Sequence, residues 1–367
     1  MLHIVIYSEL KRWHGGRERW LKYFLKGVYS KFDKICVYFL KKSVENRDEC
    51  IDQDFSRCNN IKWYPVEASN YVSWIVRTFT EIISKIKQGD ILVSVGSGPE
   101  AIVGMILRRL KRIRFVLWLR TILISELSRR KRRLFVLLAG FMERLALATA
   151  DIIIANGRDT KDYYQNLTKK QINVIPNAID NFFQLSKIAP PRFGKPIKIA
   201  FMGRFVEERG SNYFVELSRK LSNDSQFQFV VYGPSYGKER ETYQNLVFKG
   251  HYFPEDLPLI LPNVDIVAFL LPSKGIHGGG VSHALLEAMA AKRLIIAWQN
   301  PITSNLLNDK NAILVNEGNL DGIVSKLKEI GRCPEIFLEK CLEASKTARE
   351  FSVQNHVIKF IRIVREE

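Results

Sequence analysis

Short apolar runs alternate with helix-length amphipathic segments along the whole chain, and this alternation restricts the possible fold more than any other feature. In the first half, the runs predicted as strands are 2–7, 34–39, 91–95, 114–119 and 151–155. The helices predicted between them are 17–31, 73–87, 99–111, 126–147 and 158–167. Strands that are separated by helices are typical of parallel sheets built from strand–helix–strand units.

The same pattern begins again after a segment rich in proline and glycine, residues 186–196. The strands predicted beyond it are 197–202, 228–232, 265–270, 294–297 and 313–315. A chain of 367 residues is long enough for two domains with separate cores. We therefore predict an α/β protein of two Rossmann-like domains with parallel sheets, at residues 1–185 and 186–352.

The sequence predicts neither export nor a membrane-spanning helix. Met1 leads directly into an apolar strand and not into a secretory signal. The longest apolar region, 134–150, is interrupted by Glu143 and Arg144 and is shorter than the roughly 20 residues that span a bilayer. The five cysteines lack the paired spacings of zinc or redox motifs, so we expect free thiols in a reducing cytoplasm.

Positive charge is concentrated in the first domain. The formal net charge is +18, and residues 101–150 alone hold 12 basic and 2 acidic side chains, with basic runs at 108–112 and 129–133. Such a surface attracts an anionic partner, although it can also serve solubility alone. The predicted helix 126–147 combines a basic run with an apolar face, which either lies on an anionic membrane or packs against the sheet.

Two loops of the second domain have the composition of phosphate-binding segments. The predicted strand 197–202 runs into Gly203 and Arg204, and Arg209 follows five positions later. Two guanidinium groups at this spacing can reach one diphosphate, or they can be exposed loop residues that pair with neighbouring glutamates.

The second loop, 272–282, contains three consecutive glycines: Gly278, Gly279 and Gly280. Glycine lets a backbone approach a ligand closely, and the helix that follows Val281 and Ser282 offers its N–H groups to an anion. Glu287 lies within that helix among apolar residues, so its carboxylate is expected in a semi-buried site with partners such as sugar hydroxyls.

These two segments also resemble motifs of the family 4 glycosyltransferases. Gly203–Gly210 is similar to the family's Gly-Arg-x-x-x-x-Lys-Gly loop, and Gly279–Ala290 is similar to its Glu-x7-Glu region. Further similar segments follow in the family's order: His14–Glu18, Asp151–Ile154, Val174–Asp180 and Phe351–His356. The resemblance implies the GT-B fold, in which two Rossmann-like domains face a cleft and a final helix, here 353–367, packs back on the first domain.

The resemblance also implies roles for residues of the second domain. Arg204 and Arg209 would contact the donor diphosphate, and Glu287 matches the second glutamate, which binds the donor ribose. Gly279 stands where the first glutamate is expected. We therefore expect that His277 or Lys274 reaches the donor sugar instead, that the donor preference differs, or that activity is reduced. His251 and Tyr252 stand where the family often holds the base, and they do not distinguish uridine from guanosine.

In the first domain the resemblance places Gly15 and Gly16 near the donor phosphate and the acceptor. Arg120 occupies the approximate position of a histidine in many members. A guanidinium cannot act as a general base near neutral pH, but it can stabilise negative charge, and the alternative is one more surface arginine. Ser97 begins a turn that either lines the cleft or only starts a helix.

The function implied is transfer of a sugar from a nucleotide diphosphate sugar to a glycan or lipid-linked glycan, with retained configuration. No cofactor and no obligatory metal are expected. The enzyme would be cytoplasmic, with residues 108–133 as a contact for the inner face of an anionic membrane. Two alternatives remain: a glycosyltransferase or binder directed at nucleic acid, and a GT-B subunit without activity that binds a nucleotide sugar.

Overall fold

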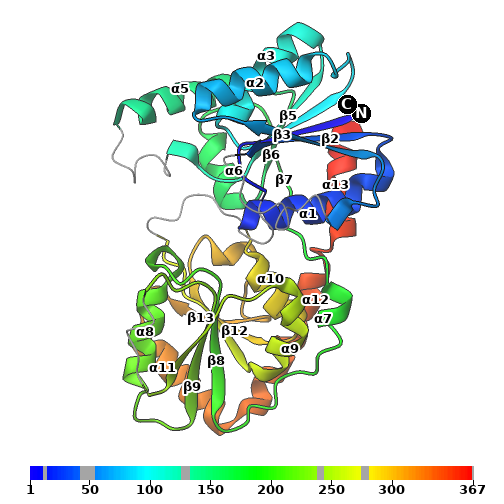
Figure 1. Ribbon diagram of the computed structural model, residues 1–367. Helices are drawn as coiled ribbons and strands as arrows, with labels where there is room; N and C mark the ends of the chain where they lie inside the picture. Colours follow the sequence, from blue (N-terminus) through cyan, green and yellow to red (C-terminus); the bar gives the residue numbers. More distant parts are fainter. Residues whose placement is uncertain (11–14, 42–53, 125–132, 238–243, 274–280, 366–367) are drawn as a thin grey trace. The chain divides into compact units, whose positions relative to one another are not determined.

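The computed structural model describes residues 1–10, 15–41, 54–124, 133–237, 244–273 and 281–365. The chain divides into two compact units (Figure 1). Met1–Asn177 and the C-terminal segment from Val353 form the first unit, and the second runs from Ala178 to Ser352. Ile179 pairs with Ser352, so the second unit begins before the segment 186–196 that was expected as the linker.

The first unit contains a seven-stranded parallel sheet in the order β3-β2-β1-β4-β5-β6-β7. Its strands are β1 (Leu2–Ile6), β2 (Ile35–Lys41), β3 (Ile61–Glu67), β4 (Ile91–Val95), β5 (Arg114–Leu119), β6 (Ile152–Ala155) and β7 (Ile172–Val174). The central strands are almost continuously apolar because helices cover both faces of the sheet.

Strand β5 has an apolar core on each of its two faces, and its successive side chains point alternately into one core and the other. Leu117 and Leu119 pack into the core beneath α2 (Tyr71–Ile83), α3 (Pro99–Lys111) and α5 (Arg133–Thr149). Trp118 points to the opposite face and contacts the rings of Trp20 and Phe24 on α1 (Gly16–Val28) and of Phe360 on α13 (Val353–Arg365). The remaining helix of the unit is α6 (Arg158–Gln165).

The second unit repeats this plan with a six-stranded parallel sheet in the order β10-β9-β8-β11-β12-β13. Its strands are β8 (Ile197–Met202), β9 (Phe227–Tyr232), β10 (Leu246–Gly250), β11 (Ile266–Phe269), β12 (Leu294–Gln299) and β13 (Ile313–Asn316). Its helices are α7 (Phe182–Leu185), α8 (Ser211–Lys220), α9 (Leu257–Ile260), α10 (His283–Ala290), α11 (Leu320–Arg332) and α12 (Leu338–Arg349). The predicted fold class, two parallel-sheet α/β domains, is confirmed.

All ten predicted strands are present, and three further strands were missed. The missed strands, β3, β7 and β10, are edge strands of their sheets. β3 contains Pro65, β7 has only three residues, and β10 ends in Lys249 and Gly250, so each lacks the uninterrupted apolar run of a central strand. The helix predicted at 126–147 corresponds to α5, and residues 125–132 lie outside the described part of the chain.

Among the described helices, none combines the length and the apolar composition that crossing a bilayer requires.

The aromatic cluster around Trp118 yields a stability prediction. The Phe360 side chain is fully buried, with ring-centroid distances of 4.9 Å to Phe24 and 5.6 Å to Trp118. Removing such a ring leaves a cavity, so Phe360→Ala should lower the free energy of unfolding by about 3–5 kcal/mol. Urea unfolding measures this, and Ile358→Ala, on the exposed side of the same helix, should change it by less than about 0.5 kcal/mol. Equal effects of the two variants would show that α13 does not hold the cluster.

Candidate functional site

Each sheet has one point at which the strand order reverses direction. In the first sheet this point lies between β1 and β4, and in the second it lies between β8 and β11. Open parallel sheets bind ligands at such points, beyond the carboxyl ends of the strands. The loops that were singled out in the sequence follow these strands: Gly15 and Gly16 come after β1, Gly203–Gly210 after β8, and residues 272–282 after β11.

Glycines allow the loops after β8, β9 and β11 to come into backbone contact. Gly203 has φ +118° and Gly233 has φ +139°, and a Cβ added to Gly233 would lie 1.9 Å from the carbonyl oxygen of Gly203. Gly210 has φ +84°, and a Cβ there would lie 2.1 Å from the carbonyl oxygen of Leu270. The carboxyl edge of this sheet is therefore lined by closely packed backbone.

Arg204 and Arg209 lie on this edge as a pair of like charges. Arg204 is exposed, and Arg209, at the end of a 3-10 turn, is half-buried. Burial lowers the pKa of the Arg209 guanidinium to about 10, the positive charge of Arg204 contributes to the decrease, and Glu208 opposes it. An anion bound between two such groups would relieve both the desolvation and the repulsion.

The N-terminus of α10 lies after the strand next to β8. Ser282 is its N-cap and makes no side-chain capping bond, and Val281 before it is buried. Glu287 lies in the second turn and is only 1% exposed, so it is more deeply buried than expected. Lys274, His277, Gly278, Gly279 and Gly280 lie outside the described residues.

Two residues that the sequence analysis did not identify fix the start of this loop. Both carboxylate oxygens of Glu317 accept hydrogen bonds from the backbone N–H of Ser273, each at 2.9 Å. Asn300 donates to the carbonyl oxygen of Leu271 at 2.8 Å and to Glu317 at 3.1 Å. These partners follow β12 and β13, far from the loop in sequence, and no local motif marks them.

The expected base-binding residues differ in their surroundings. The ring of Tyr252 is buried in the core and meets Tyr232 edge-on at a centroid distance of 6.5 Å, whereas His251 is exposed. The Tyr252 side chain therefore stabilises the fold, and a contact of this segment with a base stays a prediction.

In the first unit, Gly15 leaves space for a buried carboxylate. Gly15 is the N-cap of α1, and a Cβ there would lie 2.7 Å from an oxygen of Glu18, whereas a Cβ on Gly16 would meet nothing within 4 Å. The Ser8 hydroxyl donates to Glu18 at 2.6 Å. The Glu18 carboxylate also lies close enough to the Arg120 guanidinium to oppose part of the decrease in its pKa that burial causes.

Arg120 is a buried residue with incomplete hydrogen bonding, and it is not the surface arginine considered as the alternative. It follows β5 and is 4% exposed, its Nη2 donates to the side-chain oxygen of Asn177 at 2.7 Å, and its guanidinium lies 4.8 Å from the ring centre of Trp20. Within the described structure its Nε and Nη1 have no hydrogen-bond partner. Burial, with a smaller effect of Arg17, lowers the pKa of Arg120 to about 9.

A second buried polar cluster, also missed, lies beside the ends of β4 and β5. The hydroxyl groups of Ser97 and Tyr164 donate to the same oxygen of Glu143 at 2.8 Å and 2.5 Å. Burial raises the pKa of Glu143, while these two hydrogen bonds oppose the shift. Ser97 therefore does more than start a helix, because it helps to hold a buried carboxyl group at this edge of the sheet.

Comparison with known proteins connects both edges to one family. Residues 15–181 match the sequence profile "Glycosyltransferase Family 4", and residues 196–332 match "Glycosyl transferases group 1". The chain belongs to the family 4 glycosyltransferases. In this member of the family, the matched ranges contain every described residue singled out above as a site candidate.

Solved structures confirm the GT-B fold of this family 4 chain. HepE from Anabaena, in complex with UDP, is 14% identical with a TM-score of 0.78, and the match covers 100% of both chains. Sucrose-phosphate synthase from Thermosynechococcus elongatus is 12% identical with a TM-score of 0.79, over 100% of this chain and 98% of that one. The lipopolysaccharide outer core galactosyltransferase WaaB is 14% identical with a TM-score of 0.71, over 100% and 99%. A search of curated protein sequences finds no match.

Within this family 4 chain, Arg120 can be compared with Arg293, which is also buried but is surrounded by acceptors. Arg293 donates to the carbonyl oxygens of Ala291, Leu261, Val264 and Ala189. Replacing an incompletely paired buried charge by an apolar side chain is often stabilising. We expect Arg120→Met to raise the free energy of unfolding by about 1–2 kcal/mol, and Arg293→Met to lower it by about 3 kcal/mol because several carbonyl groups lose their donor.

Urea unfolding of the two variants measures both changes, and circular dichroism checks that each variant is folded. A loss of stability in Arg120→Met as large as that in Arg293→Met would mean that Arg120 serves the fold and is not kept for a ligand.

Proposed function

We propose that this protein transfers a sugar from a nucleotide diphosphate sugar to a hydroxyl group of a glycan or lipid-linked glycan. The observation that carries the proposal is the Arg204 and Arg209 pair at the carboxyl edge of β8, beside β11 and the loop that leads to α10. Two adjacent cations and a helix N-terminus suit a diphosphate, which carries negative charge on both phosphates. HepE, which has a similar structure, is known in complex with UDP and with UDP-glucose, and this supports a nucleotide donor here.

The proposed reaction proceeds with retained configuration at the anomeric carbon. The bond between this carbon and the diphosphate oxygen breaks, and its electron pair leaves with the diphosphate. The acceptor oxygen bonds to the same face of the carbon, and its proton passes to the departing phosphate oxygen. Arg204 and Arg209 would stabilise the charge that grows on the leaving group, which is the larger part of the catalytic effect expected of such a site.

Further residues of each unit have proposed roles in the reaction. Glu287 would accept hydrogen bonds from the donor ribose, and the amides of 278–281 would hold a phosphate. Because Gly279 replaces a glutamate of the family pattern, we propose that Lys274 or His277 contacts the donor sugar. Arg120 keeps two guanidinium nitrogens, Nε and Nη1, without partners in the described structure, and we propose that it binds negative charge of a substrate or transition state.

Binding of UDP tests the donor site without a known acceptor. A ligand that binds only the folded state at about 100 times its Kd stabilises the protein by roughly 2.7 kcal/mol, so millimolar UDP should raise the Tm by several degrees. Arg204→Ala, Arg209→Ala and Glu287→Gln should each lose most of this shift in a thermal-shift assay. Arg219→Ala, which removes an exposed cation that pairs with Glu216 on α8, should keep it.

The outcomes of this assay separate the possibilities. A shift with GDP in place of UDP would keep the site and change the base. No shift with either nucleotide would overturn the donor-site assignment. If UDP raises the Tm but no UDP is released from UDP-sugars when glycan acceptors are present, the result would favour the GT-B subunit without activity.

Metal removal gives a separate prediction. We propose that the guanidinium pair, and not a divalent cation, neutralises the diphosphate. EDTA should therefore change the Kd for UDP by less than about twofold in a calorimetric titration, since two cationic side chains already supply the charge. Binding that weakens at least tenfold in EDTA and returns with Mg²⁺ would contradict this part of the proposal.

A further inference from the structure

One face of α5 consists of large apolar side chains that nothing in the described structure covers. Leu137 is 74% exposed, Leu138 56%, Phe141 66% and Leu145 39%. Their spacing of one, three and four residues places them along a single stripe of the helix. The opposite side of the same helix packs into the core through Ala146 and Leu147. The apolar face of this helix is therefore partly exposed, and the alternative in which it is entirely buried against the sheet is wrong.

The neighbouring helix extends this apolar surface. α3 packs beside α5 and exposes Ile106 by 38% and Leu110 by 60%. Exposed hydrophobic side chains are common when isolated, but a group of six on two helices that pack together marks an interaction surface. We call the six side chains Ile106, Leu110, Leu137, Leu138, Phe141 and Leu145 the apolar patch.

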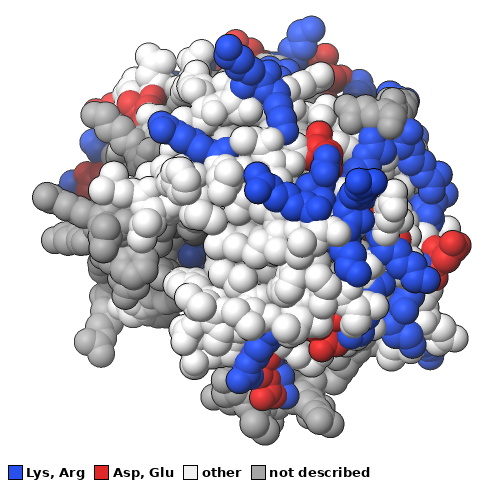
Figure 2. Space-filling model, turned by 90° about the horizontal axis from the view of Figure 1, so that it is seen from above, with Lys and Arg blue, Asp and Glu red and all other residues white. Residues whose placement is uncertain are grey.

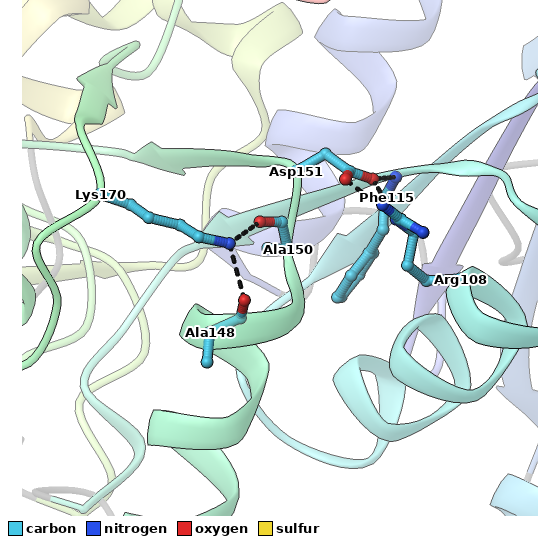
Figure 3. Close-up of polar contacts among 6 residues, drawn as sticks. All are labelled: Arg108, Phe115, Ala148, Ala150, Asp151 and Lys170. Carbon is cyan, nitrogen blue, oxygen red and sulfur yellow. Dashed lines mark hydrogen bonds and ion pairs between the residues drawn. The ribbon is translucent and has the colours of Figure 1, made fainter.

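Ionic and polar contacts hold the C-terminal parts of the two helices in place (Figure 3). Arg108 of α3 forms hydrogen bonds to both carboxylate oxygens of Asp151, at 2.9 Å and 2.8 Å, and Asp151 also accepts from the backbone N–H of Phe115. Lys170 donates to the carbonyl oxygens of Ala148 and Ala150 at the end of α5. These two cations serve the fold, so the patch is presented by fixed helices.

Other cations close to the patch are available to a partner. Arg109 and Arg112 at the end of α3 and Arg144 on α5 are exposed, and no carboxylate of the described chain forms an ion pair with them. The only acidic side chain described between 101 and 150 is that of Glu143, which is buried. Figure 2, which views this side of the first unit, shows uncharged surface with many more Lys and Arg than Asp and Glu around it.

We propose that the apolar patch and its flanking arginines form a docking surface for an anionic lipid bilayer. A helix that lies in the plane of a membrane inserts its apolar side chains between the headgroups while its cations contact lipid phosphates. The chemistry favours this partner over two others. A second copy of the chain would bring like charges together across the contact, and a nucleic acid would gain little from a patch in which Phe141 is the one ring on which a base could stack.

This inference does not depend on sugar transfer, because the patch is defined by exposure and charge alone. If both proposals hold, the bilayer would present a lipid-linked acceptor to the protein directly, which would select for acceptors with a lipid anchor.

Vesicle flotation tests the proposal with the full chain. We expect binding to vesicles of phosphatidylcholine that contain about a quarter phosphatidylglycerol, and at least tenfold weaker binding to phosphatidylcholine alone. Each cation near an anionic surface contributes about fivefold in affinity, so Arg109→Ser with Arg144→Ser should weaken binding by about 25-fold, and high salt should act in the same direction. Leu137→Glu and Phe141→Glu should each weaken it at least tenfold, because a charge replaces an inserted apolar group.

A matched control separates the patch from general surface hydrophobicity. Leu259 on α9 of the second unit is 75% exposed, almost the same as Leu137, so Leu259→Glu should leave vesicle binding unchanged. All these side chains are exposed, and an unchanged Tm confirms folding of each variant. Equal binding to both vesicle types, or insensitivity to Leu137→Glu and Phe141→Glu, would overturn the proposal. The proposal would also be overturned if the protein bound duplex DNA more tightly than anionic vesicles. Self-association that Leu137→Glu abolishes would overturn it too, because the surface would then bind a second copy of the chain.

Discussion

The exclusively parallel pairing of both sheets is the constraint on which the rest of this molecule depends. Parallel neighbours require a crossover after every strand, so each sheet is covered on both faces and its central strands are almost continuously apolar. All loops that leave the carboxyl ends then meet at one edge, and the reversal of strand order leaves a space there. Gly15 and Gly16 after β1, and Gly203 and Arg204 after β8, lie at these edges.

The arginines that we propose as ligand-binding residues at these edges differ from Arg293, which precedes β12 and serves the fold, in whether their hydrogen bonds are complete. Arg293 donates to four carbonyl oxygens and needs no further partner. Arg120 is equally buried but has one hydrogen bond and one ring contact, and Arg209 lies beside another cation. Buried groups with unmet hydrogen bonds or repelling charges lower stability, and they are retained where a ligand completes them.

The sequence was sufficient to predict the fold because local patterns and global topology agree in the central strands. Edge strands such as β3 and β10 were missed because one side of each has no neighbouring strand, which permits proline, charge and short length. The glycine loops and Arg204 could be singled out because spacing along the chain carries their signal. The contact of Asn177 with Arg120, and that of Glu317 with the loop after β11, could not be predicted because they arise only when distant segments meet.

The return of α13 to the first unit has a consequence for how this protein is made. The surface formed by Trp20, Phe24 and Trp118 receives Phe360 only after all residues of the second unit have left the ribosome. A nascent chain therefore carries an incomplete aromatic core through most of its synthesis, while the unit encoded later can close first. Until the last residues are released, these rings lack their cover, and transiently exposed apolar surface of this kind makes a folding chain prone to aggregation.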